Sequence, residues 1–284
     1  MSFWYLQAIT GLSFAMLLFL LAAGLSLIFG LMRIINLAHG ALYLVASYLS
    51  LSVMRGTGSF LLALLVGAAA VTLIGLFMER RFLNRLYRME LAQVLLTFGF
   101  LFILSDLTQW VWGGEPQIMP KPALFAGSLR LGEMMFPIYR LLVIAVGIVV
   151  AVLLGLIQQY TSLGAKVRAG VDDAEMTRGL GVDLPRLFTG VFAMGAMLAG
   201  VGGVMGGPII GANLDAAFEI LLFAFVVVII GGMGSLKGAF LASLFVGLID
   251  TFGKALFPEY SLFTIFAPMA IVLAIRPTGL FGRT

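Results

Sequence analysis

Nine stretches of mostly apolar residues follow one another along this chain of 284 residues, and they restrict its fold more than any other feature. A helix that crosses ~30 Å of hydrocarbon needs about 20 mostly apolar residues at ~1.5 Å each. Apolar residues make up 62% of the chain and charged residues 11%, too few to cover a soluble core with polar groups. We therefore expect an all-α polytopic membrane protein with about 8–9 transmembrane segments, built as a single transmembrane domain over 1–284. The stretches are 6–29, 37–54, 60–78, 91–112, 138–158, 187–206, 218–232, 237–252 and 261–276.

The seventh and eighth stretches are short, and a glycine-rich segment at 231–235 separates them. Their length leaves two arrangements open, two thin spans or a broken re-entrant pair. Because such a dense run of glycines weakens a helix, we expect an unwound turn here. We assign Gly231, Gly232 and Gly234 to a hinge or gate of a transport pathway.

The basic residues indicate an orientation. The net charge is +4, but the Lys and Arg residues lie between apolar stretches rather than in one patch, which argues against nucleic-acid binding and for positive-inside topology. If the loop 79–90 is cytoplasmic, strict alternation places all but five of the 17 basic residues inside. We expect a multi-pass protein of the bacterial inner membrane, with its N-terminus outside and its C-terminus in the cytoplasm. Basic residues on the inner side then include Arg33, Arg88, Lys237, Arg276 and Arg283.

Composition excludes several chemistries. Cysteine is absent and His39 is the single histidine, so disulfides, thiolate sites and histidine clusters for zinc cannot form within the chain. A membrane-embedded enzyme would need His, Asp or Glu clustered at one depth, and no such cluster can be assembled from this sequence. We expect no catalytic residues, no metal site and no bound cofactor.

The most polar stretch of its length lies between the fifth and sixth apolar stretches and reads SLGAKVRAGVDDAEMTRGLGVDLPR (162–186). Asp172 and Glu175 have the spacing of a capping box, with Asp172 as the cap. Gly181 is placed to end the helix in a left-handed conformation. The pattern predicts a two-turn helix over about 173–180.

This polar stretch has two interpretations. One is a solvated connector between two spans, although simple connectors are usually short. The other is a rigid lever over about 160–186 at the cytoplasmic surface, where the small residues Ala169, Gly170 and Ala174 would let another protein approach closely. The chain has no Walker P-loop ending in GKS or GKT, so an ATP-driven machine would take its motor from another chain.

Three regions resemble one family of membrane proteins. They read GLSLIFGLMRIINLAHGALYLVASYL (24–49), RAGVDDAEMTRGLGVDLPRLFTGVFAMGAMLAGVGGVMGG (168–207) and FVVVIIGGMGSLKGAFLASLFVGLIDT (225–251). They are similar to the LivH/LivM permeases, the membrane subunits of ABC importers for branched-chain amino acids and related solutes. The first and third regions are similar to the LivH-type subunit in particular. Because the regions follow family order from the first span to the eighth, they are more specific than a short motif.

The resemblance implies an ABC importer permease fold and a set of partners. These are a second, LivM-like permease subunit, two cytoplasmic ABC ATPase subunits and an extracytoplasmic solute-binding protein, around a chain held in the lipid bilayer. The resemblance also implies that the polar stretch couples the permease to the ATPase. The residues at the coupling-motif positions are Arg168, Ala169, Asp172, Glu175 and Gly181.

Two polar residues, Asn36 and His39, lie where the first apolar stretch turns into the second. In lipid their polar groups are costly unless they face protein or a water-filled path, so we assign both to a pathway or gate near the cytoplasmic side. The alternative is that they cap the second helix, with Asn36 as its N-cap.

Four acidic residues are expected toward the outer side. Asp106 and Asp250 lie near the outer ends of their stretches, where a satisfied interfacial group is favoured over contact with solute. Asp215 and Glu219 are expected on the outer surface, where a binding protein would dock through salt bridges.

Small residues recur every fourth position in the sixth stretch. Gly195, Ala199, Gly203 and Gly207 form a ridge that lets two helix backbones approach closely. We expect this ridge to serve helix packing rather than solute contact.

Two functions remain to be compared. The first is a permease subunit that forms half of the translocation pathway of a binding-protein-dependent importer for branched-chain or other hydrophobic amino acids, amides, urea or small aromatic acids. The alternative is a self-sufficient secondary transporter of small solutes, for which only Asp106, Asp250 and His39 offer ionisable groups within the membrane. A capped polar stretch would have no explanation in such a transporter, so the sequence favours the permease.

Overall fold

The computed structural model describes residues 2–87, 89–131, 134–260 and 263–282, so Arg88 and Arg283 lie outside the described residues. Within these residues each of the nine apolar stretches is a helix, as predicted. By length and composition six of these helices, α1, α3, α4, α5, α8 and α10, are able to cross a membrane. The helices are α1 Ser2–Met32, α2 His39–Thr57, α3 Phe60–Arg81, α4 Glu90–Trp112, α5 Ile138–Tyr160, α8 Leu184–Ile210, α9 Ala216–Gly231, α10 Leu236–Leu256 and α11 Phe263–Ile275.

Short elements connect these helices. The strands β1 (Ser128–Leu131) and β2 (Met134–Pro137) pair antiparallel in the long connection between α4 and α5. The polar stretch after α5 forms two helices, α6 (Ser162–Asp172) and α7 (Ala174–Gly179). The remaining elements are the 3-10 turns η1 Leu83–Leu86, η2 Ala123–Phe125 and η3 Pro258–Tyr260.

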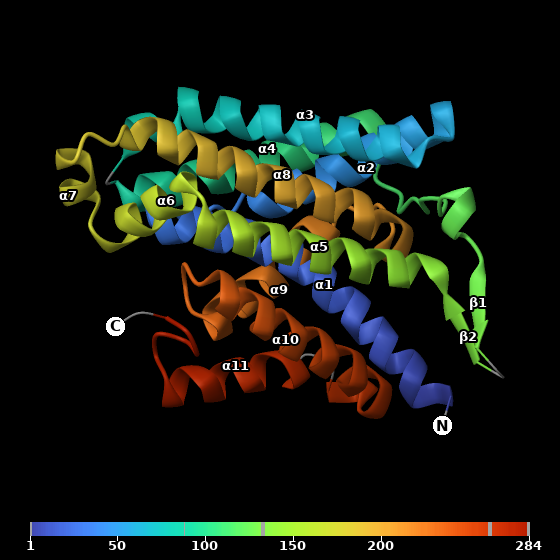
Figure 1. Ribbon diagram of the computed structural model, residues 1–284. Helices are drawn as coiled ribbons and strands as arrows, with labels where there is room; N and C mark the ends of the chain where they lie inside the picture. Colours follow the sequence, from blue (N-terminus) through green and yellow to red (C-terminus); the bar gives the residue numbers. More distant parts are fainter. Residues whose placement is uncertain (1, 88, 132–133, 261–262, 283–284) are drawn as a thin grey trace.

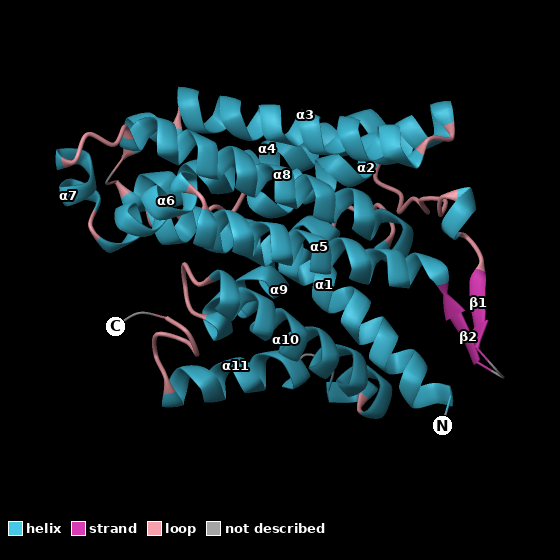
Figure 2. Cartoon of the chain, viewed as in Figure 1, coloured by secondary structure: helices cyan, strands magenta, loops and turns pink. Residues whose placement is uncertain are grey.

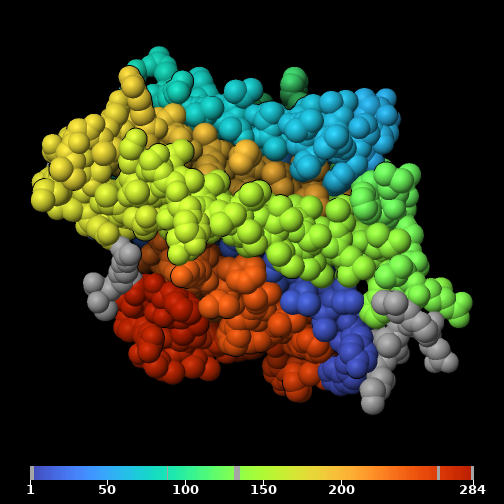
Figure 3. Space-filling view, viewed as in Figure 1, coloured from blue at the N-terminus to red at the C-terminus, as the bar shows by residue number. Residues whose placement is uncertain are grey.

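Consecutive apolar helices run in alternate directions between two ends of the molecule (Figures 1 and 2). One end carries α6 and α7, and we call it the α6–α7 end. The other carries the N-terminus and the β1–β2 hairpin, and we call it the hairpin end (Figure 1). The space-filling view shows α6 and α7 projecting at one end, with α5 lying along the face between the two ends (Figure 3).

Helices α9 and α10 each run from one end to the other. Just before α9, Ala212 pairs with Gln117 of the connection that carries the hairpin. At the far end of α9, the Leu280 N–H donates to the Ile230 carbonyl at 2.8 Å, and this C-terminal segment lies at the α6–α7 end. At the hairpin end, the Phe252 ring of α10 stacks on Trp4 near the start of α1. The two short apolar stretches are therefore two separate helices, joined by the glycine-rich segment.

Helix α1 forms the centre of the bundle. Its residues from Ala15 to Ala23 are buried almost completely, between α5, α8, α9 and α10. The helices meet closely at glycines, because a Cβ built at Gly195 of α8 would lie 3.0 Å from the Gly24 carbonyl of α1. A Cβ at Gly203 would clash with the Tyr43 carbonyl of α2. The predicted packing role of the small-residue ridge is therefore confirmed.

The outer faces of α3, α4 and α5 are apolar and exposed. On α3 the exposed residues include Leu61, Leu65 and Leu73, and on α4 they include Leu91 and Leu95. Apolar helix faces of this extent belong in lipid or against another membrane subunit. The chain is a multi-pass membrane protein.

Candidate functional site

The α6–α7 segment is attached to the bundle through α6. Thr161 caps α6, its hydroxyl oxygen accepting from the Gly164 N–H at 3.1 Å. Val167 and Gly170 form the buried face of α6, and a Cβ built at Gly170 would lie 2.8 Å from Leu31 Cδ1 of α1. Gly170 therefore serves contact with α1 and not with another protein, contrary to our interpretation of its small size. The capping pattern in the sequence did not predict α6, although Thr161 is a capping residue placed directly before it.

The cap of α7 is Asp173, so the prediction of Asp172 as the cap is wrong. One carboxylate oxygen of Asp173 accepts from the Glu175 N–H and the Met176 N–H, both at 2.9 Å. Asp172 is still the last residue of α6, and the extended backbone falls on Asp173 instead. Helix α7 is accordingly Ala174–Gly179, slightly shorter than predicted.

The predicted stop at Gly181 is confirmed. Gly181 has φ 84°, a left-handed conformation that costs glycine little. The Val182 N–H donates to the Thr177 carbonyl at 3.3 Å and the Gly181 N–H to the Arg178 carbonyl at 2.9 Å. This pair of bonds is the Schellman arrangement, and it fixes the direction in which the chain leaves α7.

The α6–α7 segment presents its coupling-motif residues to the outside. Ala169, Asp172, Glu175 and Gly181 are exposed, and Arg168 is half-buried. Two apolar residues that our sequence analysis missed are exposed among them. Met176 is 67% exposed and Leu180 is 76% exposed, one helical turn apart. Such exposed apolar side chains among charges at an aqueous end are typical of an interaction surface.

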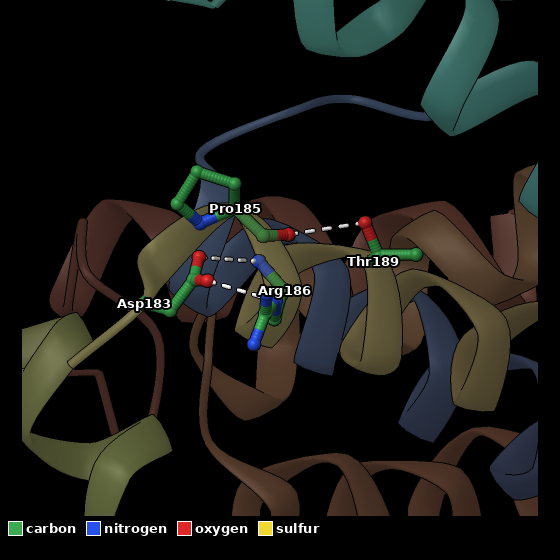
Figure 4. A network of polar contacts seen from close by, with 4 residues as sticks. All are labelled: Asp183, Pro185, Arg186 and Thr189. Carbon is green, nitrogen blue, oxygen red and sulfur yellow. Dashed lines mark hydrogen bonds and ion pairs between the residues drawn. The ribbon is translucent and has the colours of Figure 1, made fainter.

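The segment returns to the bundle through a capped start of α8 (Figure 4). Asp183 accepts from the Arg186 N–H at 3.2 Å and also pairs with the Arg186 guanidinium at 2.9 Å. The Thr189 hydroxyl lies 3.0 Å from the Pro185 carbonyl and 2.7 Å from the buried carboxylate of Glu79 in α3. The start of α8 is thereby joined to the end of α3.

Asn36 and His39 lie inside the bundle near the α6–α7 end. Both are 0% exposed. His39 Nε2 lies 3.1 Å from the Leu21 carbonyl of α1, whereas the Asn36 amide group has no hydrogen-bond partner among the described residues. The alternative that these residues cap α2 is wrong, because Ala38 precedes the helix and makes no side-chain cap.

The glycine-rich segment forms the unwound turn that we predicted. Gly232 and Gly234 have φ 93° and 81°, so both adopt left-handed conformations. A Cβ built at Gly234 would lie 2.9 Å from the Gly30 Cα of α1. Helix α1 thus touches both groups of assigned gate residues, with its Gly24 beside His39 and its Gly30 beside the turn.

These features define a class of membrane protein. The described residues form a multi-pass bundle with a capped, exposed pair of short helices at one end. Among those residues no group of three or more side chains is arranged to hold a metal ion. This is the organisation of a membrane transport subunit with an exposed segment at one end.

Comparison with known proteins identifies the family. The sequence profile described as branched-chain amino acid transport system / permease component matches residues 7–273. The chain belongs to this family of permease components.

Individual relatives match over nearly the whole chain. The high-affinity branched-chain amino acid transport system permease protein BraD of Pseudomonas aeruginosa is 29% identical over 98% of this chain and 95% of its own length. The corresponding LivH protein of Escherichia coli K12 is 27% identical with the same coverage. The LivM protein of Salmonella typhimurium is 28% identical over 95% of this chain and 68% of its own length. No solved structure matches the chain.

Proposed function

We propose that this chain is the LivH-type permease subunit of a binding-protein-dependent ABC importer for branched-chain or other hydrophobic amino acids or related small solutes. The observation that carries the proposal is the α6–α7 segment, which is capped at both ends and exposes Met176 and Leu180 beside its charged residues. Its proposed partners are a LivM-like second permease subunit, two cytoplasmic ABC ATPase subunits and an extracytoplasmic solute-binding protein. The proposed orientation puts the α6–α7 end in the cytoplasm of a bacterial cell.

The proposed mechanism treats the α6–α7 segment as a lever. Arg168, Ala169, Asp172, Glu175 and Gly181 are its proposed coupling residues. Because α6 packs on Leu31 of α1 and the segment continues into α8, movement of the ATPase would shift these two central helices. The chemical energy comes from the partner ATPases, and this chain supplies a rigid mechanical path.

The proposed gate lies where α1 ends. Gly231 ends α9, Gly232 and Gly234 belong to the turn that follows, and Gly234 lies against Gly30 of α1. A change in the position of α1 would therefore move this turn. Asn36 and His39 are proposed to line the pathway at the same end. A buried amide without a partner costs about 1–3 kcal/mol, and water or solute in the open state would satisfy it.

Charge reversal on the lever tests the proposal. In the purified complex reconstituted with its solute-binding protein, we expect Glu175→Arg and Arg168→Glu to reduce solute-stimulated ATP hydrolysis about fivefold or more, the lower range of site-to-site coupling. The control Glu115→Arg makes the same change in an exposed residue toward the hairpin end and should leave stimulation intact. ATPase subunits should co-purify with the wild-type chain in fixed stoichiometry. Full stimulation in both lever variants would contradict the coupling role.

A further inference from the structure

A charged cavity opens at the hairpin end, away from the proposed coupling and gate residues. Its volume is about 450 Å³, within the range of about 300–1,000 Å³ usual for small-molecule sites. It lies between α1, α5, α8, α9 and α10, where α5 and α9 begin and α10 finishes. Four charged residues line it, in a chain with only 11% charged residues. They are Arg140, Glu219, Asp250 and Lys254.

Two of these charges neutralise each other. The Lys254 ammonium lies 2.9 Å from one carboxylate oxygen of Asp250 and 3.0 Å from the other. Asp250 is only 3% exposed, so this pair satisfies an acid inside the bundle. The ammonium also lies 5.4 Å from the centre of the Phe223 ring, which holds it over the cavity wall.

Arg140 is a cation without an acidic partner. It is half-buried in the first turn of α5, and the Ser13 hydroxyl at 3.3 Å is its hydrogen-bond partner. No carboxylate of the described residues lies within 4.0 Å of its guanidinium. Removing a cation from water without an anion is unfavourable, and the amide dipoles at the start of α5 also favour an anion here. The site is therefore arranged to receive one.

Glu219 supplies the opposite charge on the same cavity. It lies in the first turn of α9 and makes no ion pair within the described part of the chain. Arg140 and Glu219 are also not paired with each other, so a gap separates one cation from one anion. The wall between them is apolar, formed by Phe14, Ile220 and Phe223.

We propose that this cavity binds a small zwitterion with an apolar side chain, its carboxylate at Arg140 and its ammonium at Glu219. An amino acid with an aliphatic side chain has this distribution of charge and apolar surface. The inference rests on the proposed transport function and gives it a contact for solute in the permease itself. Because the cavity is at the end opposite the lever, it would receive solute before the gate at Asn36 opens.

Sequence analysis missed this site for a specific reason. Glu219 is expected on the outer surface, and Arg140 is one of the five basic residues that charge alternation does not place inside. Neither has a partner along the sequence that marks it as part of a site. Only the packing of α5 and α9 against α1 brings the two charges to one cavity.

The test uses the purified permease–ATPase complex in nanodiscs, without the solute-binding protein, and saturation-transfer NMR to detect weak binding. The probes are L-leucine, 4-methylpentanoate, which lacks the ammonium, and 3-methylbutylamine, which lacks the carboxylate. Because each analogue loses one charge-assisted contact, wild-type protein should bind either analogue at least about tenfold more weakly than leucine.

Each variant should lose one of these two preferences. Arg140→Gln should weaken leucine about tenfold or more and lose its preference for leucine over the amine, while Glu219→Gln should lose the preference for leucine over the carboxylate. Arg140→Lys and Glu219→Asp keep the charge and should restore part of the binding. Lys121→Gln and Glu115→Gln remove exposed charges from the connection between α4 and α5 and should change nothing.

The outcomes of this test separate the inference from the proposed function. If the complex with its solute-binding protein imports amino acids but wild-type protein does not distinguish leucine from its two analogues, the cavity is not the site. Equal leucine binding by Arg140→Gln, Glu219→Gln and wild type would overturn it as well. If the complex imports neither amino acids nor related small solutes, the proposed function fails first.

Discussion

Asn36 is the residue whose burial is hardest to explain by packing alone. Its side chain is fully buried and its amide has no partner within the described residues, although the sequence offered it a role as a helix cap. A chain that retained this residue only for stability would gain by replacing it with an apolar one. The position of the cap was equally hard to predict, because adjacent aspartates at 172 and 173 have the same capping chemistry. The choice depends on where α6 ends, and a local pattern does not contain that information.

The first prediction concerns this amide. We expect Asn36→Leu to leave thermal stability unchanged or raised, since it removes an unpartnered polar group of similar size. We expect uptake of leucine by the reconstituted importer to fall about tenfold, because the pathway loses a polar contact worth about 1–1.5 kcal/mol. Thermal unfolding and uptake are measured on the same preparation. Asn84→Leu, a change of the same kind in the η1 turn outside the bundle core, is the control. Full uptake by Asn36→Leu would assign the residue to packing alone.

At the scale of elements, the α6–α7 segment differs from an ordinary loop because one face packs on the bundle and the other is exposed. The helix-ending role of Gly181 follows from the sequence, since glycine tolerates the left-handed conformation that ends α7. The packing of α6 on α1 does not follow from the sequence. Gly170 meets Leu31, which is far away along the chain, and no local pattern predicts such a contact. The nine apolar helices were predictable from their hydrophobic patterns, whereas their mutual packing was not.

The second prediction tests the contact between Gly170 of α6 and Leu31 of α1. Gly170→Leu would place a side chain where Leu31 already lies, and overpacking of this kind costs about 1–3 kcal/mol. We expect a lower unfolding temperature and faster hydrogen exchange in α6, together with loss of solute-stimulated ATP hydrolysis. Ala165→Leu adds a larger side chain to the exposed face of α6 and should leave both stability and exchange unchanged. If the amide hydrogens of α6 exchange in Gly170→Leu at the wild-type rate, α6 does not depend on this contact.

On the scale of the whole molecule, the two ends have different chemistry. The α6–α7 end carries the proposed lever and the glycine turn, and the hairpin end carries the charged cavity. Charge alternation along the sequence predicted which connections share an end, and the structure agrees, with α9 and α10 running between the ends. The sequence pattern had left these two short helices undecided, because α9 has only 16 residues and its depth depends on its neighbours.

The last prediction places both ends relative to the membrane. The chain has no cysteine, so single cysteine variants give labelling without background. In spheroplasts, an impermeant maleimide should label Lys121→Cys, on the connection that carries the hairpin. It should label Arg178→Cys, on α7, only after the membrane is permeabilised. Met233→Cys, in the exposed part of the glycine turn, should behave like Arg178→Cys if α9 and α10 cross the bilayer. Labelling of Arg178→Cys in intact spheroplasts would put the lever on the side that has no ATP, and with it the coupling role would fail. Labelling of Met233→Cys alone would keep the lever and contradict α9 as a complete span.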